Sequence, residues 1–209
     1  MKENPTMQEE AAARAEGWLR VCGIDEAGRG PLAGPVVAAA VVLPVGYELP
    51  GLNDSKKLSA ARREKLYASL MQDDAVSKSV AFATVEEIDR LNILRATHLA
   101  MRRAAEGLKP PPDFCLIDGL PVKGFPLPSR ALVKGDARCL SIAAASVLAK
   151  VTRDHAMAEL HRQFPHYGWE RNAGYGTREH LSAIQHYGIT PHHRRSFAPI
   201  AQAELPLEF

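Results

Sequence analysis

The 209-residue sequence has few cysteines, few aromatic residues and little net charge. Its three cysteines, Cys22, Cys115 and Cys139, are odd in number and have no CxxC spacing, so the sequence indicates no disulfide framework. They lie in apolar segments, where we expect small buried thiols in a reducing compartment. The net charge of +2 gives no sign of a basic field over the whole surface.

Long apolar runs are also missing. No run reaches about 18 residues, so we expect no membrane-spanning helix. The first residues are polar and rich in glutamate, so we expect no secretion signal and a cytoplasmic protein. A hydrophobic content of 46% instead fits a globular protein with a substantial core.

The charge that is present is unevenly distributed. Basic residues outnumber acidic ones between Lys150 and Arg195, and seven of the 8 histidines lie in that segment. A solvated basic face and a surface for an anionic partner are both compatible with this pattern. The histidines have no spacing typical of zinc ligands.

Apolar and helical patterns predict one mixed α/β domain. We expect strands at residues 21–25, 36–43, 77–83, 114–117 and 130–133. We expect helices at residues 59–71, 84–108 and 140–163, and a shorter one at 177–186. No linker rich in glycine, proline or serine divides residues 18–209. Residues 1–17 are expected to be a helical or disordered extension, and the part after Pro165 a small helical appendage.

The most informative feature is the pair Asp25 and Glu26, which ends an apolar run and leads into Gly28, Arg29 and Gly30. Adjacent carboxylates repel each other in a partly dry site, and a divalent cation relieves that repulsion. The glycines allow the backbone to approach a ligand closely. Together these residues indicate metal-assisted chemistry on a phosphate.

Two further acids, Asp118 and Asp136, follow predicted strands. The carboxyl ends of strands are where open α/β sheets bind ligands, although an aspartate after a strand is also an ordinary turn residue. Neighbouring strand residues point to opposite faces, so Asp25 and Glu26 share a site only if the strand ends or bends there. Asp154, within a predicted helix, is interpreted as a residue paired with a nearby arginine.

Three other features carry weaker signals. Residues 28–34 have a GxGxxxG spacing, but a strand follows Pro35 where a dinucleotide-binding loop requires a helix. Lys56 and Lys57 lie in a loop and are either solvated or in contact with phosphates. Tyr175, between two glycines, either caps the core or stacks against a sugar or base.

In order along the chain, these motifs resemble those of ribonuclease HII, the type 2 ribonuclease H. The matching segments are DEAGRGP at 25–31, DSKKL at 54–58, IDG at 117–119, KGDA at 134–137, the helical stretch at 141–154, GYGT at 174–177 and HRRSFAP at 193–199. The resemblance therefore extends over most of the chain, and the ordered set is far more specific than any single motif. The extension at residues 1–17 has no counterpart in it.

The resemblance implies a ribonuclease H-like fold, with a mixed five-stranded sheet flanked by helices and a small helical C-terminal appendage. It implies an endonuclease that hydrolyses the RNA strand of RNA–DNA hybrids and cuts 5′ of single ribonucleotides embedded in duplex DNA, as ribonucleotide excision repair requires. Catalytic and metal-ligating roles are expected for Asp25, Glu26, Asp118 and Asp136. Substrate-binding roles are expected for Gly28, Arg29, Gly30, Lys56, Lys57 and Tyr175.

The expected cofactors are two divalent ions, Mg²⁺ or Mn²⁺, which would leave a 3′-hydroxyl and a 5′-phosphate. We expect a monomer whose partners are RNA–DNA hybrids and DNA containing ribonucleotides. The alternatives are a non-catalytic hybrid-binding module, a nucleotide-binding oxidoreductase, and another nuclease of the same fold. Four acids argue against the first, and the strand after Pro35 argues against the second.

Overall fold

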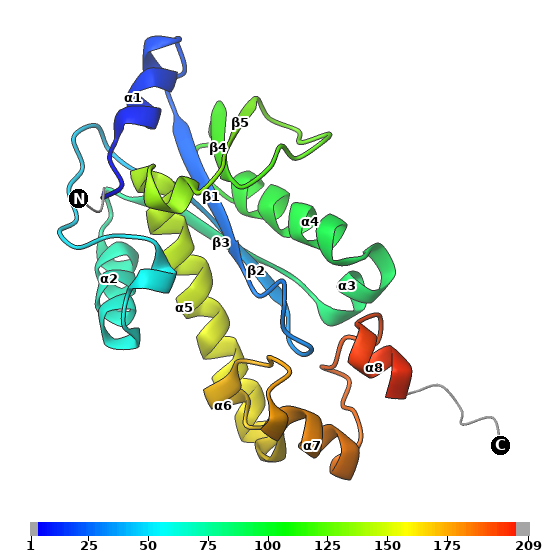
Figure 1. Ribbon diagram of the computed structural model, residues 1–209. Coiled ribbons are helices and arrows are strands. Elements are labelled where there is room, and N and C mark those ends of the chain that lie inside the picture. Colours follow the sequence, from blue (N-terminus) through cyan, green and yellow to red (C-terminus); the bar gives the residue numbers. More distant parts are fainter. Residues whose placement is uncertain (1–3, 204–209) are drawn as a thin grey trace.

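The computed structural model describes residues 4–203, which form a five-stranded mixed sheet flanked by helices (Figure 1). The strands lie in the order β3-β2-β1-β4-β5. Their bounds are β1 Val21–Ala27, β2 Val36–Val42, β3 Ser77–Ala83, β4 Phe114–Asp118 and β5 Ser129–Leu132. The architecture implied by the resemblance is therefore confirmed.

Helices cover both faces of the sheet, because the central strands are apolar on both sides. Every residue of β2 is buried. Alternate β2 side chains enter two separate cores, one under α4 and the other under α5 and α2. Figure 1 shows α4 on one side of the sheet and α5 with α2 on the other. These helices are α2 Ala60–Gln72, α4 Ile93–Glu106 and α5 Leu140–Gln163.

Strand direction determines where the acidic side chains lie. β1 runs parallel to β4, with Ile24 beside Ile117, so Asp25 and Asp118 end up at the same edge of the sheet. β5 continues in parallel beside β4 and leads to the short helix η2 (Gly135–Ala137). A sheet of this order thus collects residues that are about a hundred positions apart in the sequence.

One predicted helix is wrong in extent. The structure has two helices, α3 (Val85–Leu91) and α4, where the sequence pattern predicts one from 84 to 108. Asn92 separates them with φ 70°, and its side chain accepts a hydrogen bond from the Arg95 N–H as the cap of α4. With ψ 163° this backbone conformation lies outside the regions that non-glycine residues usually adopt, so it ends α3. Asparagine is also a good cap, so α4 begins directly after it without glycine or proline.

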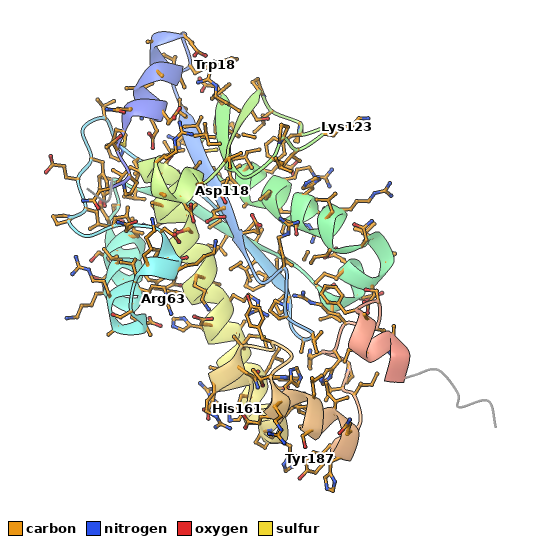
Figure 2. All side chains as sticks on the ribbon, viewed as in Figure 1. Trp18, Arg63, Asp118, Lys123, His161 and Tyr187 are labelled. Carbon is orange, nitrogen blue, oxygen red and sulfur yellow. The ribbon has the colours of Figure 1, made fainter. Side chains whose placement is uncertain are left out.

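The chain ends form smaller helices on the main domain. α1 (Gln8–Ala15) lies near one end of the sheet, and the Trp18 ring that follows stacks on Phe114 with centroids 5.0 Å apart. The C-terminal part contains η3 (Pro165–Tyr167), α6 (Trp169–Asn172), α7 (Arg178–Tyr187) and α8 (Ala198–Ala203) around the buried Trp169. Figure 2 shows Trp18 and Tyr187 at opposite ends of the molecule.

The helical appendage after Pro165 is confirmed, although α6 and α8 are additions to the single short helix expected there. The division into residues 1–17 and 18–209 stays a prediction. Within residues 4–203, no helix is both long and apolar enough to cross a membrane.

Candidate active site

Three carboxylates meet at the carboxyl edge of the sheet. Asp25, Asp118 and Asp136 each offer an oxygen, and these oxygens all lie within 4.8 Å of one another. Asp118 belongs to the end of β4, where Figure 2 labels it in the middle of the molecule. The Gly135 N–H donates to Asp118 Oδ1 at 2.7 Å, so the turn that carries Asp136 is attached to the end of β4.

The electrostatics of this cluster favour a bound cation. Burial raises the pKa of Asp25 well above its usual range, and the charges of Glu26 and Asp118 raise it further. Burial and the Asp118 charge likewise raise the pKa of Asp136 to about 6. Among the described residues, the only ion pair of the three is between Asp136 and Lys56, at 3.8 Å. Clustered, under-compensated carboxylates are the donor set that Mg²⁺ and Mn²⁺ prefer, so these residues fit a divalent metal site.

Glu26 lies beside this cluster but outside the group of three. β1 continues to Ala27, and the Glu26 N–H donates to Asp25 Oδ1 at 2.7 Å. The Glu26 carboxylate pairs with Arg29 at 3.3 Å. Burial raises the pKa of Glu26, and Arg29 opposes that shift. Glu26 is therefore close enough to the acids to interact with them, while its side chain is held toward the glycine loop.

A cavity of about 250 Å³ adjoins the carboxylates through Asp25. It brings together nearly all the predicted substrate-binding residues, and its walls are formed by Asp25, Glu26, Ala27, Gly28, Arg29, Gly30, Ser55, Lys56, Lys150, Arg153 and Tyr175. Lys57 is absent from this wall and lies 3.8 Å from Asp54. Cations and a flat aromatic ring therefore face a space next to the acids.

Tyr175 faces the glycine loop across this cavity. Its side chain is 49% exposed, which is unusual for a tyrosine that merely caps a core. The Leu32 N–H donates to the Gly174 carbonyl at 2.8 Å, so the two loops are tied together. A Cβ on Gly30 would lie 3.4 Å from Tyr175 Cε1, so the ring stands directly beside the loop.

Two buried arginines hold the glycine loop, and sequence reasoning missed both. Arg194 is 0% exposed and donates to the carbonyls of Gly28, Arg29 and Gly34, the last two at 2.9 and 3.0 Å. It therefore binds the carbonyls of the loop, and it is not among the residues that line the cavity.

Arg153, on α5, likewise binds backbone carbonyls next to the glycine loop. It is 1% exposed and donates to the carbonyls of Ala33, Pro35 and Ala173 at 3.0–3.1 Å. Burial lowers the pKa of Arg153 to about 10, and burial with the Arg153 charge lowers that of Arg194 to about 9. Both remain cationic at neutral pH, and neither forms an ion pair within the part of the chain described. The sequence does contain a sign that Arg153 is buried. It lies four residues from both Ala149 and Met157, which places all three on one buried face of α5.

Asp154 and the buried histidines lie outside the carboxylate cluster. Asp154 pairs with Lys150 at 2.5 Å, so its partner is a lysine rather than the expected arginine. His180 and His193 are buried, with their Nε2 atoms 3.1 Å apart, and the Thr190 N–H donates to His193 Nδ1. His180 Nδ1 lies 2.9 Å from the Tyr175 carbonyl, so the histidine pair supports the loop that carries Tyr175.

The family model and the curated relatives agree on one family. The sequence model described as Ribonuclease HII matches residues 22–200. The chain is 62% identical over 197 residues to the Ribonuclease HII of Cereibacter sphaeroides, covering 94% of this chain and 92% of that relative. It is 61% identical over 197 residues to that of Ruegeria pomeroyi, covering 94% and 83%. The crystal structure of ribonuclease H2 from Pyrococcus horikoshii superimposes with a TM-score of 0.75 at 27% identity, covering 89% of this chain and 97% of that one.

Proposed function

The chain belongs to the ribonuclease HII family, and from this premise we propose that it cuts duplex DNA on the 5′ side of a single embedded ribonucleotide. As a ribonuclease H, the protein is an endonuclease and a hydrolase that acts on RNA paired with DNA. The observation that carries the finer proposal is the convergence of three carboxylates beside a cavity formed by the glycine loop and Tyr175.

We assign the divalent metal site to Asp25, Asp118 and Asp136. Glu26 would be a fourth ligand, and to bind the metal its carboxylate would break its ion pair with Arg29. The family is metal-dependent, and this donor set suits either Mg²⁺ or Mn²⁺. Two bound ions would supply an activated water and a stabilised leaving oxygen, which gives a 3′-hydroxyl and a 5′-phosphate. The protein's own part is to hold these carboxylates at fixed positions close together. Because burial and mutual repulsion raise the pKa values of Asp25 and Asp136, the bound cations would keep them deprotonated.

Selectivity for a ribonucleotide requires groups that contact its 2′-hydroxyl. The backbone of Gly28, Arg29 and Gly30 suits this role, because Arg194 occupies the Gly28 and Arg29 carbonyls from behind. Among the described residues, the peptide N–H groups of Arg29 and Gly30 donate to no other group, and we assign them to the substrate. The buried guanidinium groups beneath the loop also add positive potential where a phosphate would lie.

Other residues would position the strand without reading its sequence. Lys56 and Arg29 have exposed cationic groups at the cavity, and Lys57 would reach a phosphate farther along the strand. Tyr175 offers a half-exposed ring on which the neighbouring sugar would rest. Monomeric action and a cytoplasmic location stay predictions from the sequence.

The decisive experiment uses a duplex with one embedded ribonucleotide, incubated with Mg²⁺ or Mn²⁺ and, separately, with a chelator. We expect a single cut on the 5′ side of the ribonucleotide, with no cut in chelator. Asp118→Asn should reduce turnover about 100-fold or more while duplex binding persists, because one metal ligand is lost and the cations remain. The exposed Asp74→Asn is the matched control. A protein that binds the hybrid but never cuts it would instead be the non-catalytic binding module.

A further inference from the structure

The N-terminal segment makes several specific contacts with one turn of the main domain. Residues 4–16 precede the segment matched by the family model, which begins at residue 22. Their partners are the turn at residues 138–141, directly after η2, which carries Asp136. The contacts are of three kinds: a backbone bridge, an ion pair and a buried carboxylate cap.

The backbone bridge involves Thr6. Its N–H donates to the Arg138 carbonyl at 3.0 Å, and its carbonyl accepts from the Leu140 N–H at 3.0 Å. Thr6 and Cys139 thus pair as an isolated parallel bridge. Beside it, Glu9 accepts from Arg138 Nη2 at 2.6 Å, so the same turn is held by both backbone and side chain.

Glu10 caps the first turn of α5 from a distance. Its carboxylate, 1% exposed, accepts from the Ser141 N–H at 2.7 Å and from the Cys139 thiol at 3.2 Å. Cys139, the residue at the cap position of α5, makes no side-chain cap of its own. A negative charge at this helix end is favourable, since the first N–H groups of a helix have no partners within it.

These contacts fix the turn of Asp136 from both sides. On one side the Gly135 N–H donates to Asp118. On the other, the Arg138 and Cys139 N–H groups point back to the Gly135 carbonyl, while Thr6 and Glu10 hold residues 138–141. Asp136 therefore lies between the strand that carries Asp118 and the N-terminal segment, three residues before the bridge at Cys139.

We propose that Glu10 and Thr6 are positioning residues which set the affinity of the carboxylate cluster for its divalent cation by fixing the turn that carries Asp136. The inference rests on the proposed function, since it requires Asp136 to be a metal ligand. It gives the N-terminal segment a role in the chemistry, although the segment contributes no ligand itself.

Direct binding of Mn²⁺ tests this without nucleic acid, by the electron paramagnetic resonance signal of free Mn²⁺ in a titration. Glu10→Ala should bind Mn²⁺ about tenfold more weakly, as is typical when a supporting contact of a metal ligand is lost. Cleavage by this variant should recover at high metal concentration. Glu10→Gln keeps an acceptor for the Ser141 N–H and should stay within about twofold of the wild type.

The matched control is Arg14→Ala, which removes a hydrogen bond from the same helix to the Leu43 carbonyl, away from the turn. It should leave Mn²⁺ affinity unchanged even if the unfolding temperature falls. If Glu10→Ala loses stability as Arg14→Ala does but binds Mn²⁺ like the wild type, the inference is overturned.

A second variant covers the case in which Glu10→Ala does not fold. Arg138→Ala breaks only the half-exposed pair with Glu9 and should weaken Mn²⁺ binding about threefold; unchanged affinity there overturns the inference. A wild-type protein that binds no Mn²⁺ overturns the proposed function and this inference together. Equal affinities of the wild type, Glu10→Ala and Arg138→Ala overturn only the inference.

Discussion

Replacing Gly28 by alanine is the sharpest test of how the glycine loop is built. Gly28 has φ +95°, and an added Cβ would overlap the Arg153 side chain and lie 2.8 Å from the Pro35 carbonyl oxygen. The left-handed conformation alone costs an alanine about 1–2 kcal/mol. Overpacking against a buried side chain adds about 1–3 kcal/mol, because Arg153 cannot move without losing its hydrogen bond to Pro35.

Gly17→Ala separates these two contributions. Gly17 has φ +103°, and a Cβ added there would meet no atom within 4 Å, so only the backbone contribution applies. Gly28→Ala should therefore lower the free energy of unfolding by about 2–5 kcal/mol, or roughly 10 °C in unfolding temperature, against about 1–2 kcal/mol for Gly17→Ala. Thermal and urea unfolding of both variants measure this. Equal losses would show that Arg153 does not clamp the loop.

The remaining predictions concern charge, pH and substrate contact. Asp136→Asn should raise the free energy of unfolding of the metal-free protein at pH 7 by at most about 3 kcal/mol, because burial makes the charged form of a carboxylate with a pKa of about 6 unfavourable. Calorimetry in chelator would show this as a higher unfolding temperature, and cleavage should be lost. Burial, and then the His180 charge, lower the pKa of His193 to about 4. Between pH 6.5 and 4, His193 is therefore protonated in the unfolded chain but neutral in the folded protein, which favours unfolding as the pH falls. Lowering the pH from 7 to 5 should thus cost the wild type about 2 kcal/mol more stability in urea than it costs His193→Gln, and parallel pH curves would refute this. Gly30→Ala should unfold like the wild type yet cleave about 10–100-fold more slowly, because its methyl group fills the gap beside Tyr175; normal kinetics would contradict that placement. Tyr175→Ala should preserve folding and reduce the preference for a single-ribonucleotide duplex over a long hybrid, measured by competition cleavage, since base or sugar stacking is worth about 1–3 kcal/mol.

The sequence predicts the fold well where local pattern and tertiary packing agree. The prediction for β3 matches its observed bounds, Ser77–Ala83, and the prediction for α5 matches Leu140–Gln163. The failure at Asn92 has a physical reason. Good helix formers lie on both sides, and the break between α3 and α4 depends on one asparagine with a positive φ that also caps α4.

The candidate site could be predicted in part. Asp25, Asp118 and Asp136 each follow a strand, and parallel strands bring such positions together. Arg194 could not be found in this way, because an arginine in a basic run is expected in solvent. Its burial depends on the carbonyls of a loop about 160 positions away. The role of Glu10 could not be predicted for the same reason, because its hydrogen-bond partners lie about 130 positions away at the start of α5.

The attraction of this site for phosphate has two contributions that should respond differently to salt. One comes from the exposed side chains of Arg29 and Lys56, and the other from the buried guanidinium groups of Arg153 and Arg194. The side chains of Arg29 and Lys56 are 50% and 81% exposed, so dissolved ions screen their charges. At an ionic strength of 1 M the screening length is only about 3 Å. Arg153 and Arg194 are 1% and 0% exposed, so dissolved ions shield their charges much less. Part of the attraction for the nucleic-acid phosphates should therefore persist at salt concentrations that abolish the contribution of Arg29 and Lys56.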